Sequence, residues 1–103
     1  MKKLILLLSL IASPAFAGSP IMPNSKLTPG MIDSSATVSR ICKAGYSASV
    51  RNVPQSIKHQ VFVEYSVDPT SDSFEVDHLI SLELGGSNSI QNLWPQDRKS
   101  TRL

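Results

Sequence analysis

Three polar side chains in the C-terminal third of the sequence have the types and order of a hydrolytic site. Asp77 and His78 are adjacent, and Asn92 follows them after a glycine-containing stretch. A carboxylate is a hard oxygen ligand for a divalent cation, which can stabilise charge on a phosphate. An imidazole can take a proton from water, because its ordinary pKa of about 6.5 leaves it mostly neutral at pH 7. An asparagine amide can hydrogen-bond the backbone of the intervening loop and so orient the histidine. The trio therefore suits cleavage of a phosphodiester bond.

The segments around this trio predict two short strands joined by a loop. Apolar and charged side chains alternate over residues 74–78, which is the period of a strand. Adjacent side chains on a strand point to opposite faces, so the carboxylate and the imidazole can share a site only where the strand bends or twists. The pair Gly85 and Gly86 predicts a turn, because glycine relieves steric limits on the backbone. Residues 90–94 predict a second strand, which Pro95 ends.

One helix is predicted upstream, from Pro54 to Tyr65. Proline suits the first turn of a helix, and Ile57, Val61 and Tyr65 recur on one stripe. His59 falls off that stripe and is interpreted as a surface residue. The fold class is therefore α+β, with a short helix before the two strands.

The segments before this helix carry weaker signals. Residues 40–53 space a few apolar side chains with small and basic ones, which suggests a short strand or extended segment. Residues 18–39 are rich in Ser, Pro, Thr and Gly and predict an extended leader. Residues 1–17 have the charged start, the short apolar run and the Ala15-Phe16-Ala17 site of a secretory signal peptide. We therefore expect an exported protein, periplasmic or extracellular.

The last seven residues, 97–103, differ in composition from the rest, with four charged side chains. They also equal the translation of GAT CGG AAG AGC ACA CGT CTG, a common sequencing adapter. Our hypothesis is that this heptad is non-native and that the natural reading frame is lost near Gln96. The alternative is a natural basic tail.

Charge does not by itself indicate a nucleic-acid partner. The whole chain of 103 residues has a net charge of +2, but residues 18–96 have five basic and seven acidic side chains, a net charge of −2. Within them, a basic set precedes an acidic set. The basic set, which could face phosphate, is Arg40, Lys43, Arg51 and Lys58. The acidic set, which could hold a cation, is Glu64, Asp68, Asp72, Glu75, Asp77 and Glu83. A solvated charged surface is the alternative explanation of both.

Two motifs in this order resemble the core of the HNH endonuclease family. They are EVDHLISLELGG at residues 75–86 and NLWPQ at residues 92–96. The chain is most similar to a small exported group with DHLIPLELGG and NLWP segments. Weaker likeness upstream, at residues 27–30, 41–42, 45–46 and 50–51, extends the resemblance over roughly residues 27–96.

The resemblance implies a ββα-metal (His-Me finger) fold, in which two antiparallel strands and a helix clasp one divalent ion. By position, Asp77 is similar to the metal ligand and His78 to the general base. Asn92 matches the asparagine that holds the loop and helps to orient the base. The implied cofactor is one divalent ion, with Mg²⁺, Mn²⁺, Ni²⁺ and Zn²⁺ all open, and the implied partner is nucleic acid, DNA first.

The sequence departs from the family pattern in ways that suggest a missing C-terminal segment. Ser81 stands where the group often has proline. The third motif residue, a His or Asn on the helix after the second strand, has no counterpart, and Asp97 is the nearest substitute. Cys42 is the single cysteine, although oxidising compartments favour pairs. The resemblance places its disulfide partner in that missing segment, and a buried free thiol is the alternative.

The domain is therefore expected over residues 40–96, without its C-terminal helix. The predicted function is that of an exported, metal-dependent HNH-type endonuclease that hydrolyses DNA phosphodiester bonds, here truncated, with the activity of the sequence as it stands left open. The alternative is a secreted module on the same framework that binds metal or nucleic acid without catalysis.

Overall fold

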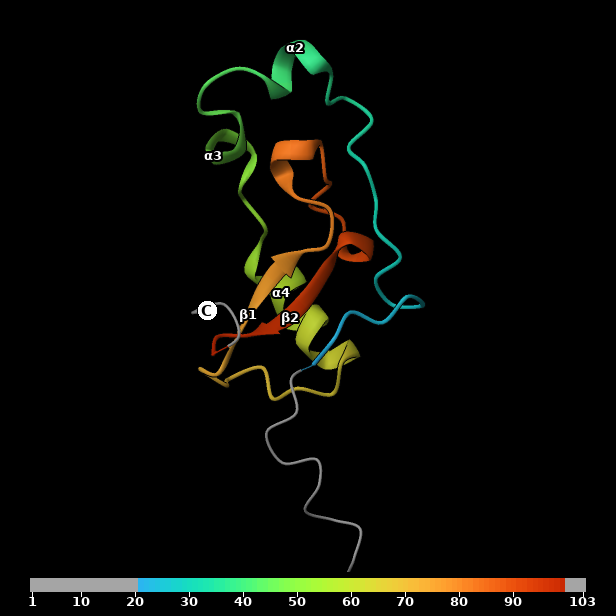
Figure 1. Cartoon of the computed structure of the whole chain (residues 1–103). Coiled ribbons are helices and arrows are strands. Elements are labelled where there is room, and N and C mark those ends of the chain that lie inside the picture. The colour runs from blue at the N-terminus through green and yellow to red at the C-terminus, as the bar shows by residue number, and fades with distance from the viewer. Residues whose placement is uncertain (1–20, 100–103) are drawn as a thin grey trace, which may run out of the picture.

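The structure is a computed structural model that describes residues 21–99, which form a small α+β domain (Figure 1). The predicted signal peptide and the last four residues of the predicted non-native heptad lie outside the described residues. The helices are α2 (Val38–Ile41), α3 (Tyr46–Val50) and α4 (Gln55–Glu64), and the strands are β1 (Phe74–His78) and β2 (Leu93–Asp97). Within the described residues, no helix is long and apolar enough to cross a membrane.

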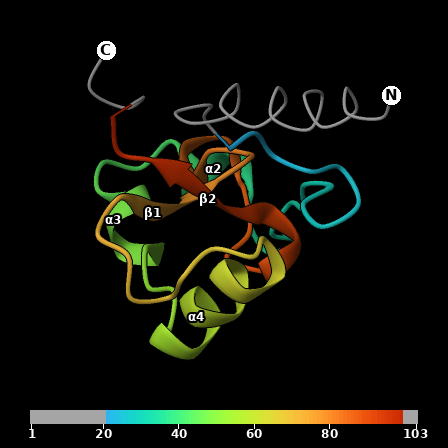
Figure 2. The same cartoon turned by 90° about the horizontal axis from the view of Figure 1, so that it is seen from below.

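Helix α4 and the two strands make the core. Pro54 is the N-cap of α4, with an extended ψ of 151°, and Tyr65 is its C-cap, so the prediction of a helix between them is confirmed. Two side chains of α4, Val61 and Phe62, are buried against Leu93 of β2. Partly buried apolar residues surround them, namely Val53, Ile57, Val67, Phe74, Val76 and Ile90. Figure 2 shows α4 lying across one face of the strand pair.

The two strands are antiparallel and form a two-stranded sheet in the described part of the chain. The register pairs Phe74 with Asp97 at one end and His78 with Leu93 at the other. The first strand begins and ends as the alternation over 74–78 predicts. The antiparallel pair of an α+β fold is thus present, whereas the ββα-metal arrangement itself stays a prediction, since residues 98–99 alone are described after β2.

The second strand starts later than predicted. Residues 90–92 form a short 3-10 helix, η4, and β2 runs through Pro95 instead of ending before it. Proline is tolerated here because each strand of a two-stranded sheet has a free edge, so the missing N–H does not break a ladder on both sides. Pro95 is buried opposite Val76 and contributes to the core.

Residues 40–53 contain the end of α2, a turn and the whole of α3, so the prediction of a strand or extended segment was wrong for residues 40–50, whereas residues 51–53 lie in no helix. Thr37 caps α2 by accepting a hydrogen bond from the backbone N–H of Arg40, and Gly45 precedes α3 in the left-handed region with φ of 85°. Each helix is too short to show the apolar period on which the sequence argument relied. A helix N-cap and a left-handed glycine were the local signals that favoured helix.

The segment before α2 lies against the loop between the strands. Ile32 forms an isolated antiparallel bridge with Gly86, and the N–H of Gly30 donates to the carbonyl of Gln91 at 2.9 Å. Thr28 is 1% exposed, and its hydroxyl donates to the carbonyl of Leu93 at 2.9 Å. This segment therefore supports the loop that follows β1.

Candidate functional site

The loop between the strands is closed by the side chain of Asn92, which is fully buried. Its Oδ1 accepts hydrogen bonds from the backbone N–H of Ile80 at 2.9 Å and of Met31 at 3.4 Å. Its Nδ2 donates to the carbonyls of Ser87 at 2.8 Å and Ile80 at 3.1 Å. Three of these four hydrogen bonds hold the backbone that follows His78, and the fourth joins that loop to the upstream segment at Met31.

The two glycines allow this loop to close. Gly85 has φ of 89°, a conformation that side-chain-bearing residues rarely adopt. At Gly86 a Cβ atom would collide with the carbonyl of Ile80 and lie 3.0 Å from Nδ2 of Asn92. The predicted turn at the glycine pair is confirmed, and the reason is mainly the close approach of the loop to itself.

Asp77 and His78 lie at the end of β1 and both line one cleft, whose volume is about 430 Å³. The cleft lies between β1 and the linker that leads from α3 into α4, and Arg51 and Lys58 line it as well. Oδ1 of Asp77 accepts a hydrogen bond from the backbone N–H of His78 at 2.8 Å, so the carboxylate is held against the main chain at the end of β1. A base, a carboxylate and two cations therefore share a cleft, although Asp77 and His78 are neighbours on a strand.

Asn88 contacts the imidazole, a contact that the sequence did not indicate. Its Oδ1 lies 2.8 Å from Nε2 of His78, and its Nδ2 donates to the carbonyl of Val50 at 2.6 Å and to Oδ1 of Asn52 at 2.9 Å. An asparagine two residues after a glycine pair indicates only a turn. No spacing rule connects it to a residue 38 positions earlier in the chain.

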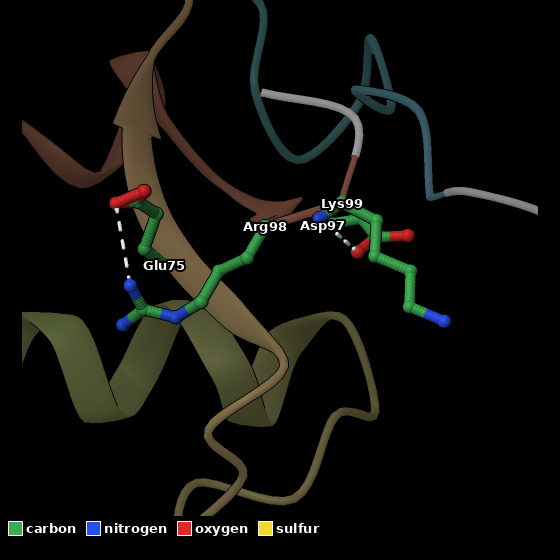
Figure 3. Close-up of polar contacts among 4 residues, drawn as sticks. All are labelled: Glu75, Asp97, Arg98 and Lys99. Carbon is green, nitrogen blue, oxygen red and sulfur yellow. Dashed lines mark hydrogen bonds and ion pairs between the residues drawn. The ribbon is translucent and has the colours of Figure 1, made fainter. Parts of the chain in front are cut away.

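Other candidates lie away from this cleft. Asp97 pairs with Phe74 at the far end of the sheet from His78, and its Oδ1 accepts from the N–H of Lys99 at 2.9 Å (Figure 3). Because strands rise about 3.3 Å per residue, Asp97 cannot serve the same site as His78. His59 is exposed on α4, as interpreted from the sequence, and it does not line the cleft of His78.

The neighbour of Asp97 contributes an ion pair at the same end of the sheet. Nη1 of Arg98 lies 3.7 Å from Oε2 of Glu75, with both side chains nearly half exposed (Figure 3). The N–H of Arg98 also donates to the carbonyl of Ser73 at 2.9 Å, so the sheet continues into the first residues of the 97–103 segment.

The described residues do not build a metal cage from protein ligands alone. Between residues 21 and 99, no three His, Cys, Asp or Glu side chains lie close enough to hold a metal ion. Asp77 and Glu75 both line the cleft, from alternate positions of β1. One or two carboxylates together with phosphate oxygens and water are the usual ligands of Mg²⁺. The donor set thus suits a hydrated hard cation better than Zn²⁺, which takes several nitrogen or sulfur ligands.

Cys42 is exposed at the C-cap of α2, and its thiol makes no disulfide within the described residues. The alternative of a buried free thiol was therefore wrong, because the cap position faces solvent. The disulfide partner expected from the family resemblance stays a prediction.

No protein-family model, curated protein or solved structure matches this chain.

Proposed function

We propose that this chain has the framework of an exported HNH-type endonuclease and acts on DNA phosphodiester bonds with one divalent ion. The observation that supports the proposal best is the shared cleft, where His78 and Asp77 lie with Arg51 and Lys58. Guanidinium and ammonium groups bind phosphate, and an imidazole beside them is placed to accept a proton from water.

Each residue has a separate role in this proposal. Arg51 and Lys58 bind the phosphate on the linker side of the cleft, and His78 takes the proton of the attacking water on the strand side. Asn92 keeps the loop after His78 in one conformation through its four hydrogen bonds. Asp77 would hold a hydrated Mg²⁺ or Mn²⁺ ion, which would supply positive charge to offset the negative charge on the phosphate.

A second function is favoured by one specific observation. Between residues 21 and 99, no three His, Cys, Asp or Glu side chains lie close enough to hold a metal ion. A secreted module that binds nucleic acid at Arg51 and Lys58 without cleaving it would keep the same cleft. In that case Asp77 and His78 line the binding surface and have no catalytic role.

Supercoiled plasmid separates the two functions. We expect the chain to nick plasmid in Mg²⁺ or Mn²⁺, and His78→Ala to lower the rate by about 100-fold or more, the usual effect of losing a general base. Asp77→Ala should raise the metal concentration needed for nicking. Lys26→Gln, which changes an exposed cation outside the cleft, is the matched control and should nick normally.

A DNA-binding measurement under the same conditions completes the test. If the chain binds DNA but does not nick it in Mg²⁺, Mn²⁺, Ni²⁺ or Zn²⁺, the result would support the binding module and overturn the proposed nuclease activity. Neither binding nor nicking would overturn both functions. Binding can be followed by filter retention of a labelled duplex, at a stated salt concentration because phosphate contacts depend on salt.

A further inference from the structure

We infer that Asn88 is a positioning residue, which fixes the tautomer of His78 and ties the Val50–Asn52 linker to the imidazole. Its importance for hydrolysis rests on the proposed function, but its contacts do not. The inference uses three hydrogen bonds of one half-buried amide, which join three separate stretches of the chain.

The orientation of the Asn88 amide follows from its partners. The carbonyl of Val50 can only accept a hydrogen bond, so the atom 2.6 Å from it must be the Nδ2 donor. The Oδ1 atom of Asn88 therefore faces the imidazole at 2.8 Å. Because an amide oxygen can only accept, Nε2 of His78 has to donate a proton to it.

The tautomer of the imidazole determines which nitrogen can act as a base. A neutral imidazole has one N–H donor and one acceptor nitrogen. With the proton on Nε2, the lone pair is on Nδ1 of His78. Water that gives up its proton must then approach Nδ1, and Nε2 is turned toward the Asn88 loop.

The same amide also sets the position of the phosphate-binding side of the cleft. Arg51 lies between Val50 and Asn52, the two residues that accept hydrogen bonds from Nδ2 of Asn88. A single side chain thus joins the backbone that carries Arg51 to the ring of His78. Movement of the linker away from β1 would break the bonds that hold this ring.

Nuclear magnetic resonance of the ¹⁵N-labelled chain, without DNA or metal, tests the assignment. The spectrum is recorded at about pH 8.5, about two units above the ordinary pKa of a free imidazole. We expect His78 to show one tautomer, with the proton on Nε2 and protected from solvent exchange. The exposed His59 is the internal reference and should show exchange between two tautomers. A His78 ring with the proton on Nδ1, or one that exchanges as His59 does, would overturn the inference.

Two variants separate the two contacts of the amide. Asn88→Ala should make the His78 ring exchange as His59 does, and should shift the backbone amides of residues 50–52. Asn88→Asp keeps an oxygen acceptor for the ring but loses the donor, so it should shift those amides while the ring proton stays protected. Gln91→Ala, an exposed amide on the same loop, should change neither.

Each result bears on the inference alone, because neither DNA nor metal is present. If Asn88→Ala does not fold, the spectrum of the unchanged chain and that of Asn88→Asp still decide. Unchanged amide shifts of residues 50–52 in Asn88→Asp would overturn the linker contact. A chain that never nicks DNA can still show the expected tautomer, so the proposed function and this inference can fail separately.

Discussion

Replacing Asn92 by alanine should destabilise the domain more than any other single change of a polar side chain in the loop. Asn92 is fully buried, and its amide makes four hydrogen bonds to backbone groups. Alanine removes the whole amide but leaves the backbone partners in place. The N–H of Ile80 and the carbonyl of Ser87, which have the shortest of these bonds, lose their partner inside the domain.

The size of the effect follows from those two groups. A buried backbone group left without a hydrogen bond costs about 1 to 3 kcal/mol, so two such groups cost about 2 to 6 kcal/mol. Water that enters the space of the lost amide can satisfy part of this, which places the expected loss near 3 kcal/mol. Small domains have total stabilities near the lower end of about 5 to 15 kcal/mol, so this loss is a large fraction of the total.

Urea unfolding followed by the fluorescence of Trp94 measures the loss. Trp94 is the single tryptophan of the chain and lies on β2, two residues after the substitution. Gln91→Ala is the control, because it removes an exposed amide one residue away. If Asn92→Ala and Gln91→Ala unfold within about 0.5 kcal/mol of each other, which is the usual range of surface changes, the argument from buried hydrogen bonds is refuted.

Four further substitutions have distinct expected results. Gly86→Ala should cost about 3 kcal/mol in urea unfolding, because the new Cβ meets a backbone carbonyl that cannot move aside, whereas Gly45→Ala, with open space but a positive φ, should cost about 1 kcal/mol. The backbone N–H and then the hydroxyl of Ser35 hold the pKa of Asp33 below its ordinary value of 3.8. Ser35→Ala should therefore raise that pKa partway, as a carboxylate titration by nuclear magnetic resonance would show. Ionised Asp33 contributes stability that is present above its ordinary pKa and is lost as the pH falls through its lowered pKa in the folded chain. In Ser35→Ala this loss should begin at a higher pH than in the unchanged chain. Arg51→Gln should lower the slope of log affinity for duplex DNA against log salt by about 0.9, the effect of one lost phosphate contact. An unchanged slope would remove Arg51 from the binding surface.

The parts of the fold that the sequence predicts well are those with a period. The alternation over 74–78 matches β1, and the apolar stripe after Pro54 matches α4. Both elements bury one face against the same core, so the pattern of apolar residues reflects the final packing. Burial still differs in detail, since Phe62 is buried whereas Tyr65 is only half-buried, and the Tyr65 hydroxyl accepts a hydrogen bond from the N–H of Asn24 at 2.9 Å.

The parts that the sequence does not predict lack such a period. Helices α2 and α3 have four and five residues, too few to repeat an apolar position. The start of β2 depends on where the 3-10 turn at residues 90–92 ends, and that turn is set by Ser89, whose hydroxyl accepts from the N–H of Gln91. The bounds of α2, α3 and β2 therefore depend on tertiary contacts, which rules based on local sequence do not include.

The residues of the candidate site likewise differ in how far the sequence predicts them. Residue types and their order, together with the family resemblance, single out Asp77, His78 and Asn92, because carboxylate, imidazole and amide each have characteristic chemistry. Asn88 has the same amide as Asn92, but its role depends on the linker 50–52 crossing beside the loop. Contacts between segments distant in sequence are invisible without the fold, so the positioning of the imidazole could not be predicted.

The two asparagines of the loop have different expected roles: Asn92 stabilises the loop, and Asn88 positions the imidazole of His78. This difference affects how activity data should be interpreted. In the described residues few apolar side chains are fully buried, so the loop depends on the buried amide of Asn92 for its conformation. Asn88 lies nearer the surface and connects the loop to the linker. A loss of nicking in Asn92→Ala would therefore reflect unfolding as much as a displaced base. A loss of nicking in Asn88→Asp at unchanged unfolding free energy would reflect the position of the linker. Only the second result assigns a role in the reaction to an amide of this loop.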